Sequence, residues 1–218
     1  MSINTHSTHS SSDPPEYATS QHSRPPHYTR HTRPQTPLVY TFTPWSPESS
    51  SMHLIPPEDA PGPTYKISVA LNLDPFLPAS YITNLDMLTD VEGEDIFVGQ
   101  FELSLNQARG IVTMGNITAR LSNCLHSIDQ SQRHWVWRLG NVALRWDCRT
   151  TLDDGSPMCI CYGSDRAAIQ VASFIPPPPL ACPPLPAASF TVFPDGHEFF
   201  EHILLSVLVI QRKLTLRL

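Results

Sequence analysis

The sequence predicts a mainly β protein in which antiparallel strands close into a barrel around one C-terminal hydrophobic helix. Three observations lead to this prediction. Short stretches rich in β-branched and aromatic residues follow one another from residue 63 onward. One pair of these stretches forms a hairpin pattern with three tryptophans on one face. The last apolar run, residues 203–210, would surround a helix axis on all sides, which is typical of a buried helix.

Residues 1–62 are expected to be a disordered tail. Twelve of the 23 prolines lie within residues 1–63, among many Ser, Thr and His residues, and large apolar residues are scarce. Such a segment buries too little apolar surface to offset its ordering entropy. Apolar and polar residues then alternate over 65–71, which is typical of a half-buried strand. The folded domain is therefore expected to cover residues 63–218.

Further strands are predicted along the rest of the domain. They are enriched in β-branched and aromatic residues and are separated by turn residues. The strand-like stretches are residues 94–104, 109–121 (two strands around Gly115-Asn116), 158–162, 167–176 and 188–193. Residues 176–186 are too rich in proline to join a sheet, and an extended polyproline segment is expected there.

The clearest element is the hairpin in "HWVWRLGNVALRWDC". Its Gly140-Asn141 dipeptide is a two-residue turn signal that tight hairpins prefer. Side chains alternate along a strand, so this turn sets six large apolar side chains on one face. The predicted cross-strand pairs are Leu139–Val142, Trp137–Leu144 and Trp135–Trp146. We expect this face to pack in the core; a tryptophan platform for a ligand is the alternative.

The C-terminal apolar run does not fit a membrane element. Residues 203–210, interrupted only by Ser206, have about half the length that a bilayer span requires. A membrane-surface helix would also show a strongly basic face, which is missing. No transmembrane span is therefore predicted.

A helix over about residues 196–213 is favoured by its ends. Asp195 and Glu198 have the spacing of an N-terminal capping box. Arg212 and Lys213 suit a helix C-terminus, where the dipole favours positive charge. A buried strand is the competing interpretation, because several residues of the run are β-branched.

This combination of elements is similar to the tubby C-terminal-like superfamily, which includes tubby proteins, LURP-one-related proteins and phospholipid scramblases. Residues 65–213 more closely resemble a fungal single-domain family of unknown function, through "WVWRLGNVALRW", "AAIQVASFIP" and "FFEHILLSVLVIQRK" with His202 ahead of the apolar block. The resemblance implies a twelve-stranded barrel around a central helix. It supplies no catalytic residues, and it suggests lipid or phosphoinositide binding as one function of the barrel.

The residues that carry chemistry form no catalytic pattern. Five cysteines without a secretory signal predict reduced thiols and a cytoplasmic protein, with a nuclear or peripheral membrane location as alternatives. Cys159 and Cys161, with Cys148 or Cys182 and a histidine, have ligand types that suit zinc. No C-x-x-C pair accompanies them, so buried structural thiols are expected.

The sequence predicts a protein that is not an enzyme and that holds no cofactor or metal. A cysteine-dependent redox or zinc enzyme is the alternative. None of His126, His134, His197 or His202 is singled out as a catalytic base.

Two P-P-x-Y motifs in the tail predict a protein partner. WW domains bind this pattern because the prolines preset a polyproline helix and the tyrosine fills an adjacent pocket. The predicted contact residues are Pro14, Pro15, Tyr17, Pro25, Pro26 and Tyr28. Chance occurrence in a proline-rich tail is the alternative. The net charge of −6 argues against nucleic acid. The sequence thus predicts a non-enzymatic interaction protein that recruits WW-domain partners, such as ubiquitin ligases, with lipid binding as the second candidate.

Overall fold

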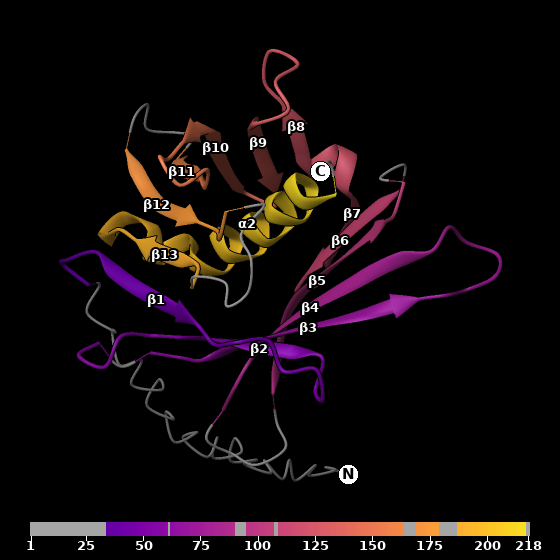
Figure 1. The fold of residues 1–218 in the computed structure, drawn as a ribbon, viewed down its shortest axis with the longest axis horizontal. Helices are drawn as coiled ribbons and strands as arrows, with labels where there is room; N and C mark the ends of the chain where they lie inside the picture. Colours follow the sequence, from indigo (N-terminus) through magenta and orange to yellow (C-terminus); the bar gives the residue numbers. More distant parts are fainter. Residues whose placement is uncertain are drawn as a thin grey trace, which may run out of the picture. The chain divides into compact units, whose positions relative to one another are not determined.

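The structure, a computed structural model, describes residues 34–60, 62–89, 95–106, 109–163, 169–178 and 187–216. The two P-P-x-Y motifs and Cys182 lie outside these residues. The described part is mainly β, with one long helix at its C-terminal end (Figure 1). The predicted fold class is confirmed at this level.

Thirteen described strands form one antiparallel sheet. The strands are β1 (Leu38–Phe42), β2 (Ser51–Ile55), β3 (Tyr65–Asn72), β4 (Ser80–Met87), β5 (Ile96–Ser104), β6 (Gly110–Met114), β7 (Ile117–Arg120), β8 (Leu125–Ser127), β9 (His134–Leu139), β10 (Val142–Thr151), β11 (Pro157–Gly163), β12 (Gln170–Ile175) and β13 (Ser189–Val192). Their order is β7-β6-β5-β4-β3-β2-β1-β13-β12-β11-β10-β9-β8. Two meanders therefore meet where β1 pairs with β13.

The described sheet is not closed. Its two edge strands, β7 and β8, are short and are joined by the single helical turn α1 (Leu121–Cys124). Leu121 and Cys124 of this turn are buried against the core. The expected closed barrel is thus not seen among the described strands, because a helical turn, whose backbone bonds within itself, stands between the two edges.

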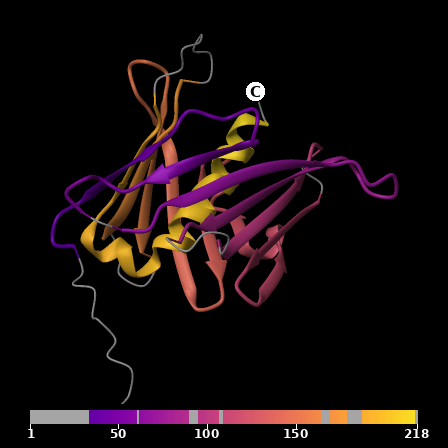
Figure 2. The same ribbon diagram turned by 90° about the horizontal axis from the view of Figure 1, so that it is seen from below.

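The C-terminal helix lies inside the curve of the sheet. A 3-10 turn, η1 (Pro194–Phe199), leads into α2 (Phe200–Thr215). Strands lie around α2 in two perpendicular views (Figures 1 and 2). Every residue from 203 to 210 is at most 9% exposed. The predicted buried helix is confirmed, and the strand alternative is wrong.

The predicted capping box is wrong. The residue that precedes η1 is Phe193, the residue that precedes α2 is Phe199, and neither makes a side-chain capping hydrogen bond. Asp195 lies inside η1, because Pro194, with its fixed φ, starts the turn one residue earlier. The basic C-terminal end is as predicted, with Arg212 and Lys213 in the last turn.

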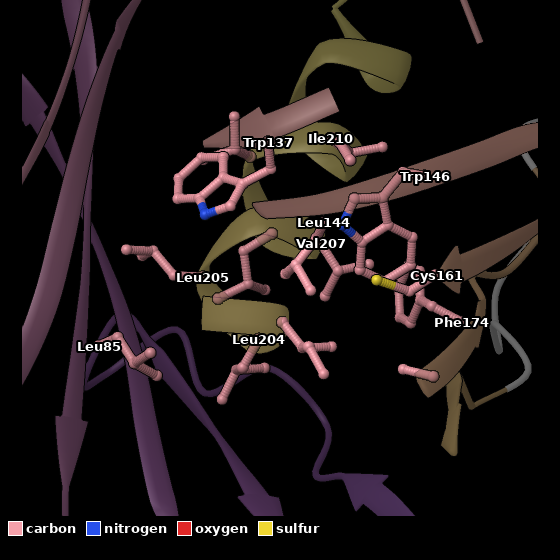
Figure 3. Close-up of a cluster of buried hydrophobic side chains, with 14 of the residues drawn as sticks. Leu85, Trp137, Leu144, Trp146, Cys161, Phe174, Leu204, Leu205, Val207 and Ile210 are labelled. Carbon is pink, nitrogen blue, oxygen red and sulfur yellow. The ribbon is translucent and has the colours of Figure 1, made fainter. Parts of the chain in front are cut away.

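The tryptophan hairpin has the predicted register. β9 and β10 pair Leu139 with Val142, Trp137 with Leu144 and Trp135 with Trp146. Gly140 has a positive φ of 60°, a conformation that glycine adopts without steric cost. All six paired side chains are buried, and Figure 3 shows Trp137 and Trp146 directed toward α2. The tryptophans are core residues, and the ligand-platform alternative is wrong.

The expected boundary between tail and domain near residue 63 is wrong, because two strands that precede it, β1 and β2, belong to the folded sheet. β1 pairs with β13, and β2 pairs with β3, so both strands belong to the same sheet as the rest of the domain. Tyr40 and Phe42 are buried, whereas Val39 and Thr41, the two residues that flank Tyr40, are exposed. The alternation is therefore present in "LVYTF", but it spans only five residues between prolines, and the surrounding composition hides it.

Candidate functional site

The described cysteines are core residues. Cys124, Cys148, Cys159 and Cys161 are free thiols and all are buried. Burial raises the pKa of the Cys148 and Cys161 thiols well above the ordinary value. A nucleophile or a zinc ligand requires the thiolate, which this environment disfavours. Among the described residues, no three His, Cys, Asp or Glu side chains form a group that could hold a metal ion.

The four histidines considered as catalytic bases lie in two places. His126 and His134 lie on β8 and β9, whereas His197 and His202 lie on η1 and α2. The second pair lines a cavity of about 280 Å³ at the start of α2, together with Tyr65 and Glu198–Glu201. Burial lowers the pKa of His202 and raises the pKa of Glu201. Both shifts favour the neutral form of the group concerned.

A larger cavity lies at the open seam of the sheet. Its volume is about 500 Å³, within the range of small-molecule sites. Three of its lining residues are cationic, and four are leucine or isoleucine. The lining residues are Leu103, Arg109, Gly110, Ile111, Arg120, Leu121, Ser122, Leu125 and Lys213. We call this cavity the seam cavity.

Strand register brings the two arginines to the seam cavity. Gly110 on β6 pairs with Leu103 on β5, which places Arg109 at the β5 end. Ile111 pairs with Arg120, the last residue of β7, so Arg120 lies at the same end. The two side chains belong to neighbouring strands at the edge of the sheet, next to α1.

The backbone at Arg109 is held by a reciprocal pair of hydrogen bonds. The Ser104 N–H donates to the Arg109 carbonyl at 2.9 Å, and the Arg109 N–H donates to Ser104 Oγ at 2.9 Å. Ser104 itself is buried. The backbone of Arg109 is therefore held in place. A fixed backbone lowers the entropy cost of ordering this residue when a ligand binds.

The close approach of α1 forms one wall of the seam cavity. A Cβ atom at position 110 would lie 2.8 Å from Leu121 Cβ, so only glycine admits α1 at this distance. Ser122 of α1 and Arg120 just before it are both exposed at the cavity.

The end of α2 supplies the third cation. Lys213 lies in the last turn of the helix and lines the seam cavity. Its neighbour Arg212 packs over the Tyr81 ring, with 4.1 Å between the guanidinium carbon and the ring centroid. This contact fixes the last turn of α2 against β4. Neither Arg109 nor Arg120 has an ion-pair partner among the described residues.

The arrangement suits an anion. Arginine donates several hydrogen bonds in a planar fork that matches phosphate and carboxylate oxygens, and lysine adds a compact positive charge. Sequence reasoning did not assign these three residues to a site, because Arg109 and Arg120 are single basic residues and Lys213 was interpreted only as part of the basic end of the helix. Only the pairing of β5, β6 and β7 and the position of α2 bring them together.

No protein-family profile matches this chain, and neither the curated proteins nor the solved structures contain a match. In the described part of the chain, no helix is long and apolar enough to cross a bilayer.

Proposed function

We propose that this protein is a non-enzymatic binding protein whose folded domain binds a phosphate-bearing anionic ligand in the seam cavity. The observation that supports the proposal is the convergence of Arg109, Arg120 and Lys213 on one cavity. The chain as a whole is acidic, with a net charge of −6. Arg109 and Arg120 have no ion-pair partner among the described residues, and two guanidinium groups at one cavity repel one another unless an anion offsets their charge.

Calorimetric titration with inositol hexakisphosphate tests this function. The variant Arg109→Gln/Arg120→Gln removes two charges, and each charge-assisted hydrogen bond contributes about 1.5–3 kcal/mol. We expect this variant to bind at least about tenfold more weakly than wild type. The matched control is Arg133→Gln/Arg138→Gln, which makes the same change of net charge at two exposed arginines. Equal affinities for wild type and both variants would overturn the proposal.

We propose a second function for the N-terminal segment, the recruitment of WW-domain proteins. It is supported by two P-P-x-Y motifs at residues 14–17 and 25–28. Two motifs on one chain can engage tandem WW domains, which raises the effective concentration of the second binding event. A pull-down with a tandem WW-domain protein tests it, and Tyr17→Ala/Tyr28→Ala should abolish recovery. Equal recovery of wild type and this variant would contradict it.

We also propose that the fold is an open relative of the tubby-like barrel. The support is the buried helix α2 and the antiparallel strands around it, with α1 at the place where β7 and β8 would otherwise pair. An experimental structure tests the proposal. A close similarity to a tubby-like domain, with α1 between β7 and β8, would support it. An α2 that lies outside the sheet would contradict it.

A further inference from the structure

The loop between β3 and β4 exposes a cluster of large apolar side chains. Phe76 is 92% exposed and Leu73 is 69% exposed, and Leu71 and Leu77 are also exposed. The hairpin that carries them projects away from the rest of the described domain in two perpendicular views (Figures 1 and 2). Single exposed apolar residues are ordinary, but a contiguous group at a projecting end indicates an interaction surface. We call residues 71–77 the apolar tip.

Local hydrogen bonds hold the apolar tip in shape. The Leu77 N–H donates to the Asp74 carbonyl at 3.1 Å, which closes a β-turn with Pro75 at its second position. The Phe76 N–H donates to Asp74 Oδ1 at 2.9 Å, and the Asp74 N–H donates to Asn72 Oδ1 at 3.1 Å. Because the turn is ordered, it presents the Phe76 side chain to a partner with little further loss of backbone entropy.

The apolar tip lies at the same end of the sheet as the seam cavity, but it does not line the cavity of its own chain. Ser80, where β4 begins after the tip, pairs with Ser104, where β5 ends. The Leu105 N–H donates to the Ala79 carbonyl at 3.0 Å, so the loop that leads to β6 is bonded to the loop that carries the tip. No residue of the tip is among the lining residues of the cavity. One end of the sheet therefore presents both a protruding apolar group and a cavity.

The apolar tip and the seam cavity match in polarity. Leucine and isoleucine side chains from β5, β6, α1 and β8 line the cavity, namely Leu103, Ile111, Leu121 and Leu125. The cavity volume of about 500 Å³ is large enough to admit an aromatic ring. Transfer of Phe76 and Leu73 into such a cavity removes the two most exposed side chains of the tip from water, which favours association.

The two surfaces also match in charge. The tip contains one acidic residue, Asp74, and no basic residue. Glu102 adds a second carboxylate at the base of the tip, where it accepts a hydrogen bond from Asn72 Nδ2 at 3.1 Å. The seam cavity carries Arg109 and Arg120, and neither pairs with a carboxylate among the described residues. The acidic tip of one molecule and the basic cavity of another therefore attract each other.

We infer that two copies of this chain associate by exchanging their apolar tips, so that Phe76 of each copy enters the seam cavity of the other. The same two surfaces meet twice around a twofold axis, and such an isologous contact closes as a dimer. The exchange does not rest on the proposed anion-binding function. Its reversal by an anionic ligand does, because the ligand and the tip of the other copy occupy the same cavity.

Sedimentation equilibrium of full-length protein at a series of concentrations tests the exchange. The monomer has a mass of 24.3 kDa, and we expect the average mass to approach twice this value as the concentration rises. Leu73→Ser/Phe76→Ser should raise the dissociation constant of the dimer at least about tenfold, because these apolar side chains no longer leave water. The matched control is Ile96→Ser/Phe97→Ser, which changes two exposed apolar side chains at the opposite end of β5 and should dimerise as wild type does.

Three results of this experiment would overturn the inference. The first is a wild type that stays monomeric at every concentration. The second is the same dissociation constant for the tip variant and its control. The third is an average mass that continues to rise beyond that of the dimer, since exchange around a twofold axis leaves no further tip or cavity to bind.

A charge exchange tests the contact between tip and cavity, and it does not depend on the tip variant. Asp74→Lys alone, and Arg109→Glu/Arg120→Glu alone, bring like charges together at both contacts, so each should dimerise at least about tenfold more weakly than wild type. A mixture of the two variants pairs opposite charges at both contacts, and we expect it to form dimers more tightly than either variant alone. A mixture that associates no more tightly than its components would overturn the placement of the tip in the seam cavity.

Inositol hexakisphosphate separates the exchange from the proposed function. We expect this ligand to shift wild type toward the monomer. Binding of the ligand without any change in the dimer would overturn the placement of the tip in the seam cavity. A wild type that binds the ligand but never dimerises would overturn the exchange and leave the anion site intact. A dimer that depends on the tip, without any binding of the ligand, would overturn the anion site and leave the exchange intact.

Discussion

Trp146 on β10 and Ser206 on α2 are joined by a hydrogen bond in the middle of the core. The indole Nε1–H of Trp146 donates to Ser206 Oγ at 2.9 Å, and both residues are fully buried. The Ser206 hydroxyl in turn donates to the Ile203 carbonyl at 3.0 Å. The single polar residue of the apolar run thus satisfies the one polar atom of a core tryptophan, and this fixes the rotation of α2 relative to the sheet.

Replacing Ser206 with alanine should destabilise the fold. The indole N–H of Trp146 would stay buried without its acceptor, at a cost of about 1–3 kcal/mol. The matched control is Thr215→Ala, which removes an exposed hydroxyl from the same helix that bonds only to backbone carbonyls of its own turn. Urea unfolding of the two variants measures the difference. A Ser206→Ala variant as stable as Thr215→Ala would show that the bond contributes nothing.

The two fully buried tryptophans of the hairpin should differ when each is replaced by phenylalanine. Trp137 Nε1 is buried and has no hydrogen-bond partner among the described residues, whereas Trp146 Nε1 has Ser206. Both replacements leave a similar cavity, but Trp146→Phe also loses a hydrogen bond, and Trp137→Phe removes an unsatisfied donor. We expect Trp146→Phe to lower the free energy of unfolding by at least about 1 kcal/mol more than Trp137→Phe. The reverse order in denaturant unfolding would contradict this.

The sequence was sufficient for elements in which two local signals agree. The Gly140-Asn141 turn and the alternation on both sides of it specify the β9–β10 register, and this register is observed. The burial of α2 followed from a run that is apolar on every side. β1 escaped prediction because its five residues lie among prolines and serines, and its partner β13 is distant in the chain.

The seam cavity also escaped prediction, for a different reason. Arg109 immediately precedes β6, Arg120 ends β7 and Lys213 lies in the last turn of α2, and basic residues at such positions usually belong to a solvated surface. Their convergence depends on the register of β5, β6 and β7, and on where α2 ends.

Gly196 in η1 should not tolerate a side chain. A Cβ atom there would lie 2.1 Å from the Val171 carbonyl oxygen on β12, and the neighbouring backbone cannot give way by this amount. We expect Gly196→Ala to cost at least about 2–3 kcal/mol or to displace the start of α2. The matched control is Gly163→Ala, where the nearest atom would be 3.8 Å away. Thermal unfolding compares the two variants, and equal midpoints would mean that η1 does not pack on β12.

Acidification should weaken the fold through His202 at the start of α2. Burial lowers its pKa in the folded state below the ordinary value of about 6.5. As the pH falls through about 6.5, the unfolded chain takes up a proton at this position and the folded chain does not, so the free energy of unfolding decreases. Burial raises the pKa of the adjacent Glu201, which has the opposite effect, because the folded chain regains stability when this carboxyl is protonated.

Urea unfolding at about pH 7.5 and about pH 5.5 measures the net change in the free energy of unfolding that these two groups cause. We expect His202→Gln to lose less stability over this range than wild type, and Glu201→Gln to lose at least as much. A His202→Gln variant whose loss equals that of wild type would show that His202 does not control this dependence.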